Sequence, residues 1–199
     1  MSQSEKLWFK KLWYRGLGEF FYTNGIEIGF DDFITIEAPC VPDNKKAQFD
    51  DFISAGLNLI PVGGGKDSCV TASLLRNQKN LFFTVNDQKA RTECIKAAGY
   101  TENDIIKTHR TIDKRLLELN AQGFLNGHTP FSAIVAFLSL YCAYITGCES
   151  IVLSNESSAN EGNVGSDVNH QYSKSYMFES DFNEYVNKNI TSDIKYFSL

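Results

Sequence analysis

The fold of this chain is decided by one stretch, Leu57-Asn58-Leu59-Ile60-Pro61-Val62-Gly63-Gly64-Gly65-Lys66-Asp67-Ser68. Its first half carries no charge and is mostly apolar, which is typical of a short buried strand. Three glycines follow, and residues 67–77 then have the composition of a helix. Consecutive glycines bury nothing and lose the most backbone entropy on folding, so we interpret them as a loop whose N–H groups closely approach a ligand. The positive end of the helix dipole and the Lys66 ammonium predict that this ligand is a phosphate.

Three nucleotide-binding loops compete for this stretch. A Walker A loop requires Ser or Thr after its Lys and a Gly where this chain has Ile60, but Asp67 follows Lys66. The dinucleotide fingerprint G-x-G-x-x-G meets Ser68 at its third glycine. The stretch instead resembles the PP-loop of ATP pyrophosphatases, Ser-Gly-Gly-Lys-Asp-Ser, with Gly63 in place of the first Ser. A tight turn without a ligand is the alternative, although one or two glycines would suffice for it.

Composition narrows the class of protein. The chain has 199 residues, 43% hydrophobic and 22% charged, which suits one α/β domain with a sizeable core. A net charge of −5 argues against a duplex nucleic-acid partner. The longest apolar run, residues 131–146, is shorter than the ~20 residues of a bilayer span, so we expect a buried helix. Five cysteines without a CxxC pair predict reduced thiols in a cytoplasmic protein.

Strand and helix patterns alternate from residue 57 onward. Strands are expected at residues 57–62, 81–85, 104–107 and 150–154, and helices at 67–77, 88–98, 113–120 and 130–146, with a last helix ending near residue 186. This alternation predicts an α/β fold with an open, mostly parallel sheet and helices on both faces. We expect residues 1–56, with a helix at 7–22 and a β-rich segment at 30–42, to pack on the nucleotide-binding domain at 57–199.

Polar clusters interrupt this framework at three places: Asn126-Gly127-His128, residues 155–163 and Asn169-His170-Gln171-Tyr172-Ser173-Lys174. The glycine loop and residues 155–163 both follow strands. In an open parallel sheet, ligands bind at the carboxyl ends of strands where the strand order reverses, so we expect the two loops to face one crevice. Each cluster taken alone also fits an ordinary surface loop, because Asn, Ser and Gly populate loops by default.

Five segments in one order resemble a known family: Tyr14-Arg15-Gly16-Leu17-Gly18-Glu19-Phe20, residues 63–68, Asn126-Gly127-His128, Ser154-Asn155-Glu156 and Val168-Asn169-His170-Gln171-Tyr172-Ser173-Lys174. They are similar to the UDP-N-acetylmuramoyl-L-alanyl-L-glutamate epimerases of bacterial cell-wall synthesis, from about residue 12 to residue 199. The glycine loop alone indicates only the PP-loop superfamily, whereas the combination is much more specific. Members of that family are longer, so we expect this chain to be a fragment or a shortened relative.

The resemblance implies an ATP-dependent inversion of the terminal L-Glu of UDP-MurNAc-L-Ala-L-Glu, with ATP split into AMP and pyrophosphate and with magnesium as a second cofactor. It places the pyrophosphate on four residues, Gly63, Gly64, Gly65 and Ser68. Lys66 would neutralise charge as the bond between the α- and β-phosphates breaks. Asp67 would hold magnesium or cap the following helix.

Proton transfer is implied for a second group of residues. His128, His170 and Lys174 are candidates for moving the α-proton or for gripping the substrate carboxylates. Glu156 is a further candidate base or metal ligand. The sequence does not divide these roles, and it leaves the oligomeric state open.

Three other functions stay open. A different PP-loop enzyme, such as a ligase, amidotransferase or thiolase, would activate another oxygen, although a sulfur-transfer member would want a paired cysteine that the spacing lacks. A non-catalytic ATP-binding module of the same fold would bind without turnover. A membrane-surface role for the helix with Trp8 and Trp13 is the third.

Overall fold

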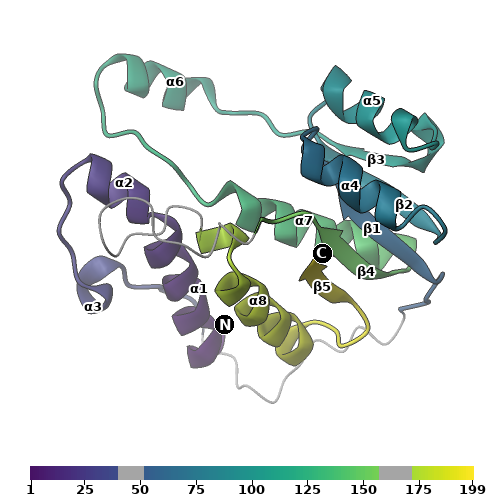
Figure 1. The fold of residues 1–199 in the computed structure, drawn as a ribbon. Coiled ribbons are helices and arrows are strands. Elements are labelled where there is room, and N and C mark those ends of the chain that lie inside the picture. Colours follow the sequence, from purple (N-terminus) through teal and green to yellow (C-terminus); the bar gives the residue numbers. More distant parts are fainter. Residues whose placement is uncertain (40–51, 157–171) are drawn as a thin grey trace. The chain divides into compact units, whose positions relative to one another are not determined.

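Five parallel strands form the sheet of this computed structural model, which describes residues 1–39, 52–156 and 172–199 (Figure 1). The strands are β1 (Leu57–Pro61), β2 (Asn80–Val85), β3 (Ile105–Thr108), β4 (Cys148–Leu153) and β5 (Lys195–Ser198). Their order across the sheet is β3-β2-β1-β4-β5, and every neighbouring pair is parallel. The predicted α/β class with an open parallel sheet is therefore confirmed.

The order of the strands reverses direction between β1 and β4. The chain moves outward from β1 through β2 to β3, and then returns to place β4 on the other side of β1. Leu59 of β1 is paired with Leu81 of β2 and with Ile151 of β4, so the first strand lies in the centre of the sheet. In open α/β sheets, the crevice at the carboxyl ends of two such strands is where ligands bind.

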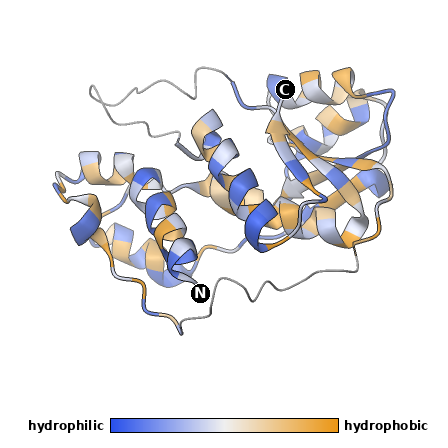
Figure 2. Ribbon diagram, turned by 90° about the horizontal axis from the view of Figure 1, so that it is seen from below, coloured by the Kyte–Doolittle hydropathy of each residue, from blue (hydrophilic) through white to orange (hydrophobic). Residues whose placement is uncertain are grey.

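Side chains along each strand point alternately to the two faces of the sheet, and both faces are buried. One face packs against the helices α4 (Lys66–Leu74) and α5 (Lys89–Ala97). Its core contains Ile60, Val62, Phe82 and Val152 with Ala72, Leu75, Cys94 and Ile95. Because successive side chains of a strand point to opposite faces, the other face carries Leu59, Phe83 and Ile151, which are at most 1% exposed. Helix α7 (Phe131–Thr146) covers this second face (Figure 1). Figure 2 shows the hydropathy of the residues along the strands.

The described residues group into two compact units. The sheet unit contains the described parts of Phe49–Arg110, Ala133–Glu156 and Val186–Leu199. The N-terminal unit contains the described parts of Met1–Gln48, Thr111–Ser132 and Ser157–Tyr185. Helix α7 begins in the N-terminal unit and continues into the sheet unit, and α8 (Tyr176–Asn189) does the same. The predicted division between residues 56 and 57 stays a prediction.

The N-terminal unit is built from short helices around aromatic side chains. Its elements are α1 (Gln3–Gly16), α2 (Gly18–Thr23), α3 (Phe30–Phe33), α6 (Lys114–Ala121), a 3₁₀ turn η3 (Tyr172–Lys174) and the first part of α8. Ser2 begins α1 with a capping box, in which its hydroxyl accepts from Glu5 N at 3.2 Å and its N–H donates to the Glu5 carboxylate at 2.7 Å. Trp8 of α1 stacks on Tyr185 of α8, with ring centroids 4.4 Å apart.

Several predicted elements are corrected by the structure. Residues 30–39 contain α3 and no strand, so the β-rich segment was wrong over the described part of 30–42. The single helix at 7–22 is two helices, because Leu17 ends α1 and begins α2. A fifth strand, β5, follows the last helix. Within the described ranges, no helix is both long enough and apolar enough to cross a membrane.

Candidate functional site

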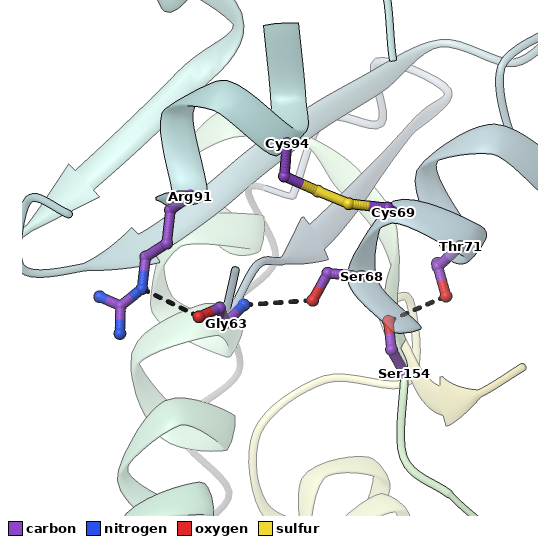
Figure 3. Close-up of a disulfide and its surroundings, with 7 residues drawn as sticks. All are labelled: Gly63, Ser68, Cys69, Thr71, Arg91, Cys94 and Ser154. Atoms are coloured by element: carbon purple, nitrogen blue, oxygen red, sulfur yellow. Dashed lines mark hydrogen bonds between the residues drawn. A yellow bond between two sulfur atoms is a disulfide. The ribbon is translucent and has the colours of Figure 1, made fainter. Parts of the chain in front are cut away.

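The glycine loop connects the carboxyl end of β1 to the first turn of α4. Val62 N donates to Phe83 O at 2.8 Å, which holds the chain in the sheet up to the loop. Gly64 then adopts a φ of +88°, a conformation that L side chains rarely adopt. Gly63 N donates to the Ser68 hydroxyl at 3.2 Å, so the buried serine of α4 folds the loop back onto its own helix (Figure 3).

The start of α4 is open to an anion. Gly65 is the N-cap residue and makes no side-chain cap hydrogen bond to the helix. A Cβ atom added at Gly63 or Gly65 would meet nothing within 4 Å, so the loop faces open space at both positions. The first N–H groups of a helix lack intrahelical partners and lie at the positive end of its dipole. This geometry suits a phosphate group.

Arg91 of α5 supports the same loop from the side of β2. Its Nε donates to Gly63 O at 3.4 Å (Figure 3). Its Nη1 donates to Asn86 O at 3.1 Å and to Val85 O. A Cβ at Gly64 would lie 3.1 Å from the Arg91 Cγ, so the glycine is needed for this close approach. Sequence reasoning missed Arg91. The available signal was a basic residue early in the helix that follows the second strand.

Residues that follow the carboxyl end of β4 lie beside α4. The Ser154 hydroxyl donates to the Thr71 hydroxyl of α4 at 2.8 Å, and Asn155 donates to the Ser198 hydroxyl at 3.1 Å. Glu156 follows directly, and its Oε1 lies 4.0 Å from the Lys66 Nζ. The first and fourth strands are parallel neighbours, and this pairing brings the two predicted site residues Lys66 and Glu156 together.

A disulfide lies beside the loop and corrects the prediction of reduced thiols. Cys69 of α4 is bonded to Cys94 of α5, with the Cα atoms 5.8 Å apart (Figure 3). The two positions are 25 residues apart, so no local spacing indicated the pair. The bond joins the helix that begins at the glycine loop to the helix that carries Arg91. Cys142 and Cys148 are buried free thiols, and burial raises the pKa of both.

Two further predicted site residues are not part of the sheet unit. His128 and Lys174 belong to the N-terminal unit, and both are exposed. His170 lies outside the described residues. In the N-terminal unit, a Cβ at Gly127 would lie 3.1 Å from the Phe20 ring and one at Gly16 would lie 2.7 Å from the Pro130 side chain. Two of the segments that carried the resemblance, the one ending at Phe20 and the Asn-Gly-His segment, therefore pack directly on one another.

Comparison with known proteins decides the family. Residues 1–199 match the family model described as the MurL N-terminal domain. This chain belongs to that family. It is 32% identical over 199 residues to the UDP-N-acetyl-alpha-D-muramoyl-L-alanyl-L-glutamate epimerase of Xanthomonas oryzae pv. oryzae, covering 96% of this chain and 42% of that protein. The protein of the same name from Salinispora tropica is 31% identical over 191 residues, covering 93% of this chain and 40% of that protein.

The chain therefore spans about two fifths of the length of the curated relatives it matches. Among solved structures, a protein assigned as a betaketoacyl-ACP reductase aligns with a TM-score of 0.40 and 14% identity, over 73% of this chain and 72% of the other. That likeness is too weak to support the fold, which rests on the strand order of the sheet itself.

The residues at this site can be compared with what a phosphate group and a magnesium ion each require. The open loop, the start of α4 and the Lys66 ammonium suit a phosphate group. No group of three His, Cys, Asp or Glu side chains that could hold a metal occurs in the described part of the chain. Magnesium is usually held by one or two carboxylates and the phosphates of the nucleotide. Asp67 in the first turn of α4 and Glu156 are the carboxylates that fit this pattern.

Proposed function

We propose that this chain is the ATP-binding part of an enzyme that inverts the terminal L-Glu of UDP-MurNAc-L-Ala-L-Glu to D-Glu in peptidoglycan precursor synthesis. One observation carries the proposal: a glycine loop with an uncapped helix stands at the reversal of strand order, with Lys66 and Glu156 facing one another there. The names of the relatives supply the substrate. We place the reaction in the cytoplasm, where ATP and nucleotide-sugar precursors occur.

The chemistry explains why such an enzyme needs a phosphate-binding loop. The α-proton beside a free carboxylate is very weakly acidic, since its removal adds a second negative charge next to the first. Transfer of an adenylyl group to the carboxylate removes that charge and releases pyrophosphate. In our proposal, the backbone N–H groups of Gly64 and Gly65 hold the phosphates, whereas the Gly63 N–H donates to the Ser68 hydroxyl. Ser68 supports the loop, and Lys66 stabilises the charge on the departing pyrophosphate.

Inversion also needs a base for the α-proton and a proton donor on the opposite face of the carbon. Water then cleaves the acyl-adenylate and regenerates the carboxylate with release of AMP. Glu156 beside Lys66 is the candidate base within the sheet unit. His128, Lys174 and His170 are the other candidates, for proton transfer or for binding the carboxylates of the peptide.

Two signatures test the proposal on this chain and on one of its longer relatives. ATP incubated with substrate should give AMP and pyrophosphate, followed by phosphorus NMR. In deuterated water, the glutamate α-carbon should acquire deuterium as L-Glu becomes D-Glu. Formation of AMP with the original hydrogen and configuration retained would indicate a PP-loop ligase or amidotransferase instead. ATP binding without turnover in both proteins would leave a non-catalytic module.

Variants assign the base. Glu156→Gln, His128→Ala, His170→Ala and Lys174→Ala are each assayed for AMP formation and for deuterium exchange. A variant that forms AMP but no longer exchanges the α-proton has lost the base and kept the activating site. If all four retain exchange, none of them is the base.

A further inference from the structure

The N-terminal unit contains a cavity of about 830 Å³ that the proposed reaction does not yet use. It lies between the end of α1, helix α2, the chain that follows α2, and the start of η3. Its aromatic and charged lining side chains are Tyr14, Arg15, Phe21, Tyr22, Glu27 and Tyr172. Pockets for small molecules commonly have volumes of roughly 300–1,000 Å³, so the cavity is large enough for a nucleotide-sized ligand.

Aromatic rings form much of its wall. The Tyr14 and Phe21 rings lie 5.8 Å apart, and the Tyr14 hydroxyl donates to Ile28 O at 3.0 Å, which fixes the ring. Tyr22 is 60% exposed, so its ring is available to a ligand that enters from solvent. Flat, partly exposed aromatic faces are the surfaces on which nucleobases stack.

One basic and one acidic side chain complete the lining. The Arg15 guanidinium carbon lies 5.9 Å from the centre of the Tyr172 ring, and Nη1 donates to the Met177 sulfur, a weak acceptor, at 3.0 Å. Glu27 is exposed at the same cavity. A guanidinium binds phosphate oxygens in a fork, and a carboxylate accepts hydrogen bonds from ribose hydroxyls. The cavity therefore offers a partner for each part of a nucleotide.

The wall beneath Arg15 is rigidly held. The Tyr172 hydroxyl donates to the Asp181 carboxylate at 2.9 Å, and Lys11 approaches the same carboxylate at 2.6 Å. Trp8 donates its indole N–H to the backbone oxygen of Asp181 at 3.0 Å. Burial and the neighbouring Asp181 raise the pKa of Tyr172, so its phenol stays protonated and keeps this hydrogen bond. A ligand over Tyr172 would meet a preformed surface, which lowers the cost of binding.

From these contacts we propose that the cavity binds the uridine diphosphate part of the substrate. The inference rests on the proposed function, which supplies a substrate with a flat uracil ring, a ribose and two phosphates. Uracil stacks on the exposed face of Tyr22, Arg15 binds the diphosphate, and Glu27 accepts from the ribose hydroxyls. The N-terminal unit thus selects the nucleotide sugar, and the glycine loop of the sheet unit binds ATP.

Calorimetric titration of the 199-residue chain with UDP and with uridine tests the inference. Arg15→Ala should weaken UDP binding about tenfold or more and uridine binding much less, because the lost contact is charge-assisted. Tyr22→Ala should weaken both ligands about fivefold or more, through the lost stacking. The matched controls are Arg115→Ala, an exposed arginine of α6 in the same unit, and Tyr141→Ala, 66% exposed on α7. Both controls should bind UDP within twofold of the wild-type chain.

Further measurements separate this inference from the proposed function. Thermal unfolding checks that every variant is folded. ATP affinity should be unchanged by Arg15→Ala, whereas Lys66→Ala should affect ATP and spare UDP. Absence of UDP binding at millimolar concentration, with ATP still bound, would overturn the cavity assignment and leave the ATP site standing. UDP binding that is lost in Lys66→Ala and kept in Arg15→Ala would also overturn it. UDP binding through Arg15, with no AMP formed by this chain or by a longer relative, would retain the cavity and reject the proposed reaction.

Discussion

The Lys66 ammonium lies 4.0 Å from the Glu156 carboxylate, and the pair joins the carboxyl ends of two neighbouring parallel strands. Their side chains are 83% and 55% exposed. Exposed ion pairs contribute about 0–1 kcal/mol to stability, so this contact is no structural requirement of the fold. It lies where a ligand of the glycine loop would lie, and we expect both residues to act on that ligand.

Lys66→Ala should therefore separate binding from stability. The affinity for ATP should fall about tenfold or more, because the contact with the phosphates is charge-assisted, while the affinity for adenosine stays the same. The melting temperature should not change measurably. Calorimetric titration of the two ligands measures the difference. Lys89→Ala, on an 88% exposed side chain of α5, is the control and should bind ATP normally. Equal ATP affinity in Lys66→Ala and wild type would remove the triphosphate from the loop.

Glu156→Gln tests whether this carboxylate binds magnesium. Without magnesium, the variant should bind ATP as well as wild type or better, because one negative charge near the phosphates is gone. With magnesium, the gain in affinity should be smaller than in wild type, because one ligand of the ion is lost. Titrations with and without the metal give both quantities. Glu93→Gln, on a 62% exposed side chain of α5, serves as the control. A magnesium effect identical to that of wild type would contradict the assignment of Glu156 as a metal ligand.

Substitution by serine should leave stability unchanged at one glycine of the loop and lower it at the next. Gly63→Ser should fold and bind ATP normally, since a Cβ there meets nothing within 4 Å and serine restores the PP-loop pattern. Gly64→Ser should cost about 1–3 kcal/mol of stability, because its φ of +88° strains any L side chain and the Cβ meets Arg91 at 3.1 Å. Chemical denaturation and ATP titration of both variants provide the measurement. Equal stability of the two variants would show that the loop does not need its left-handed glycine.

Local sequence patterns predicted most of the fold. The charge-free strand, the glycines and the alternation that follows were sufficient to locate β1 to β4, and parallel pairing then placed Glu156 beside Lys66. The edge strand β5 was missed because four residues starting at Lys195 carry no clear pattern, and only pairing with β4 orders them. The turn Phe30–Phe33 was misjudged as β-rich. Its two phenylalanines, three positions apart, both pack on Tyr14, which favours a helical turn.

Local sequence patterns did not predict the contacts between segments that are distant in the chain. Arg91 reaches three backbone carbonyls that come from the ends of two strands, and none of them is near it in a helical spacing. Cys69 and Cys94 meet because α4 and α5 cover the same face of the sheet. The cavity at Arg15 likewise needs Tyr172, from the far end of the chain, to be brought beneath it. The sequence contained these residues without any indication that they were neighbours.

Cys69→Ser isolates the contribution of the disulfide to stability. Cys69 is exposed, so a serine there leaves no cavity, whereas Cys94 is 7% exposed and belongs to the core. A bond that closes a loop of 25 residues restricts the unfolded chain and should contribute about 3 kcal/mol. In oxidising buffer, Cys69→Ser should therefore be less stable than wild type by about that amount. In dithiothreitol the two proteins should unfold at the same denaturant concentration, because the wild-type bond is then reduced. Denaturant titrations of both proteins in both buffers give the four midpoints required. If wild type unfolds at the same midpoint with and without reductant, Cys69 and Cys94 are neighbouring thiols without a bond between them. Helices α4 and α5 are then held together by packing alone.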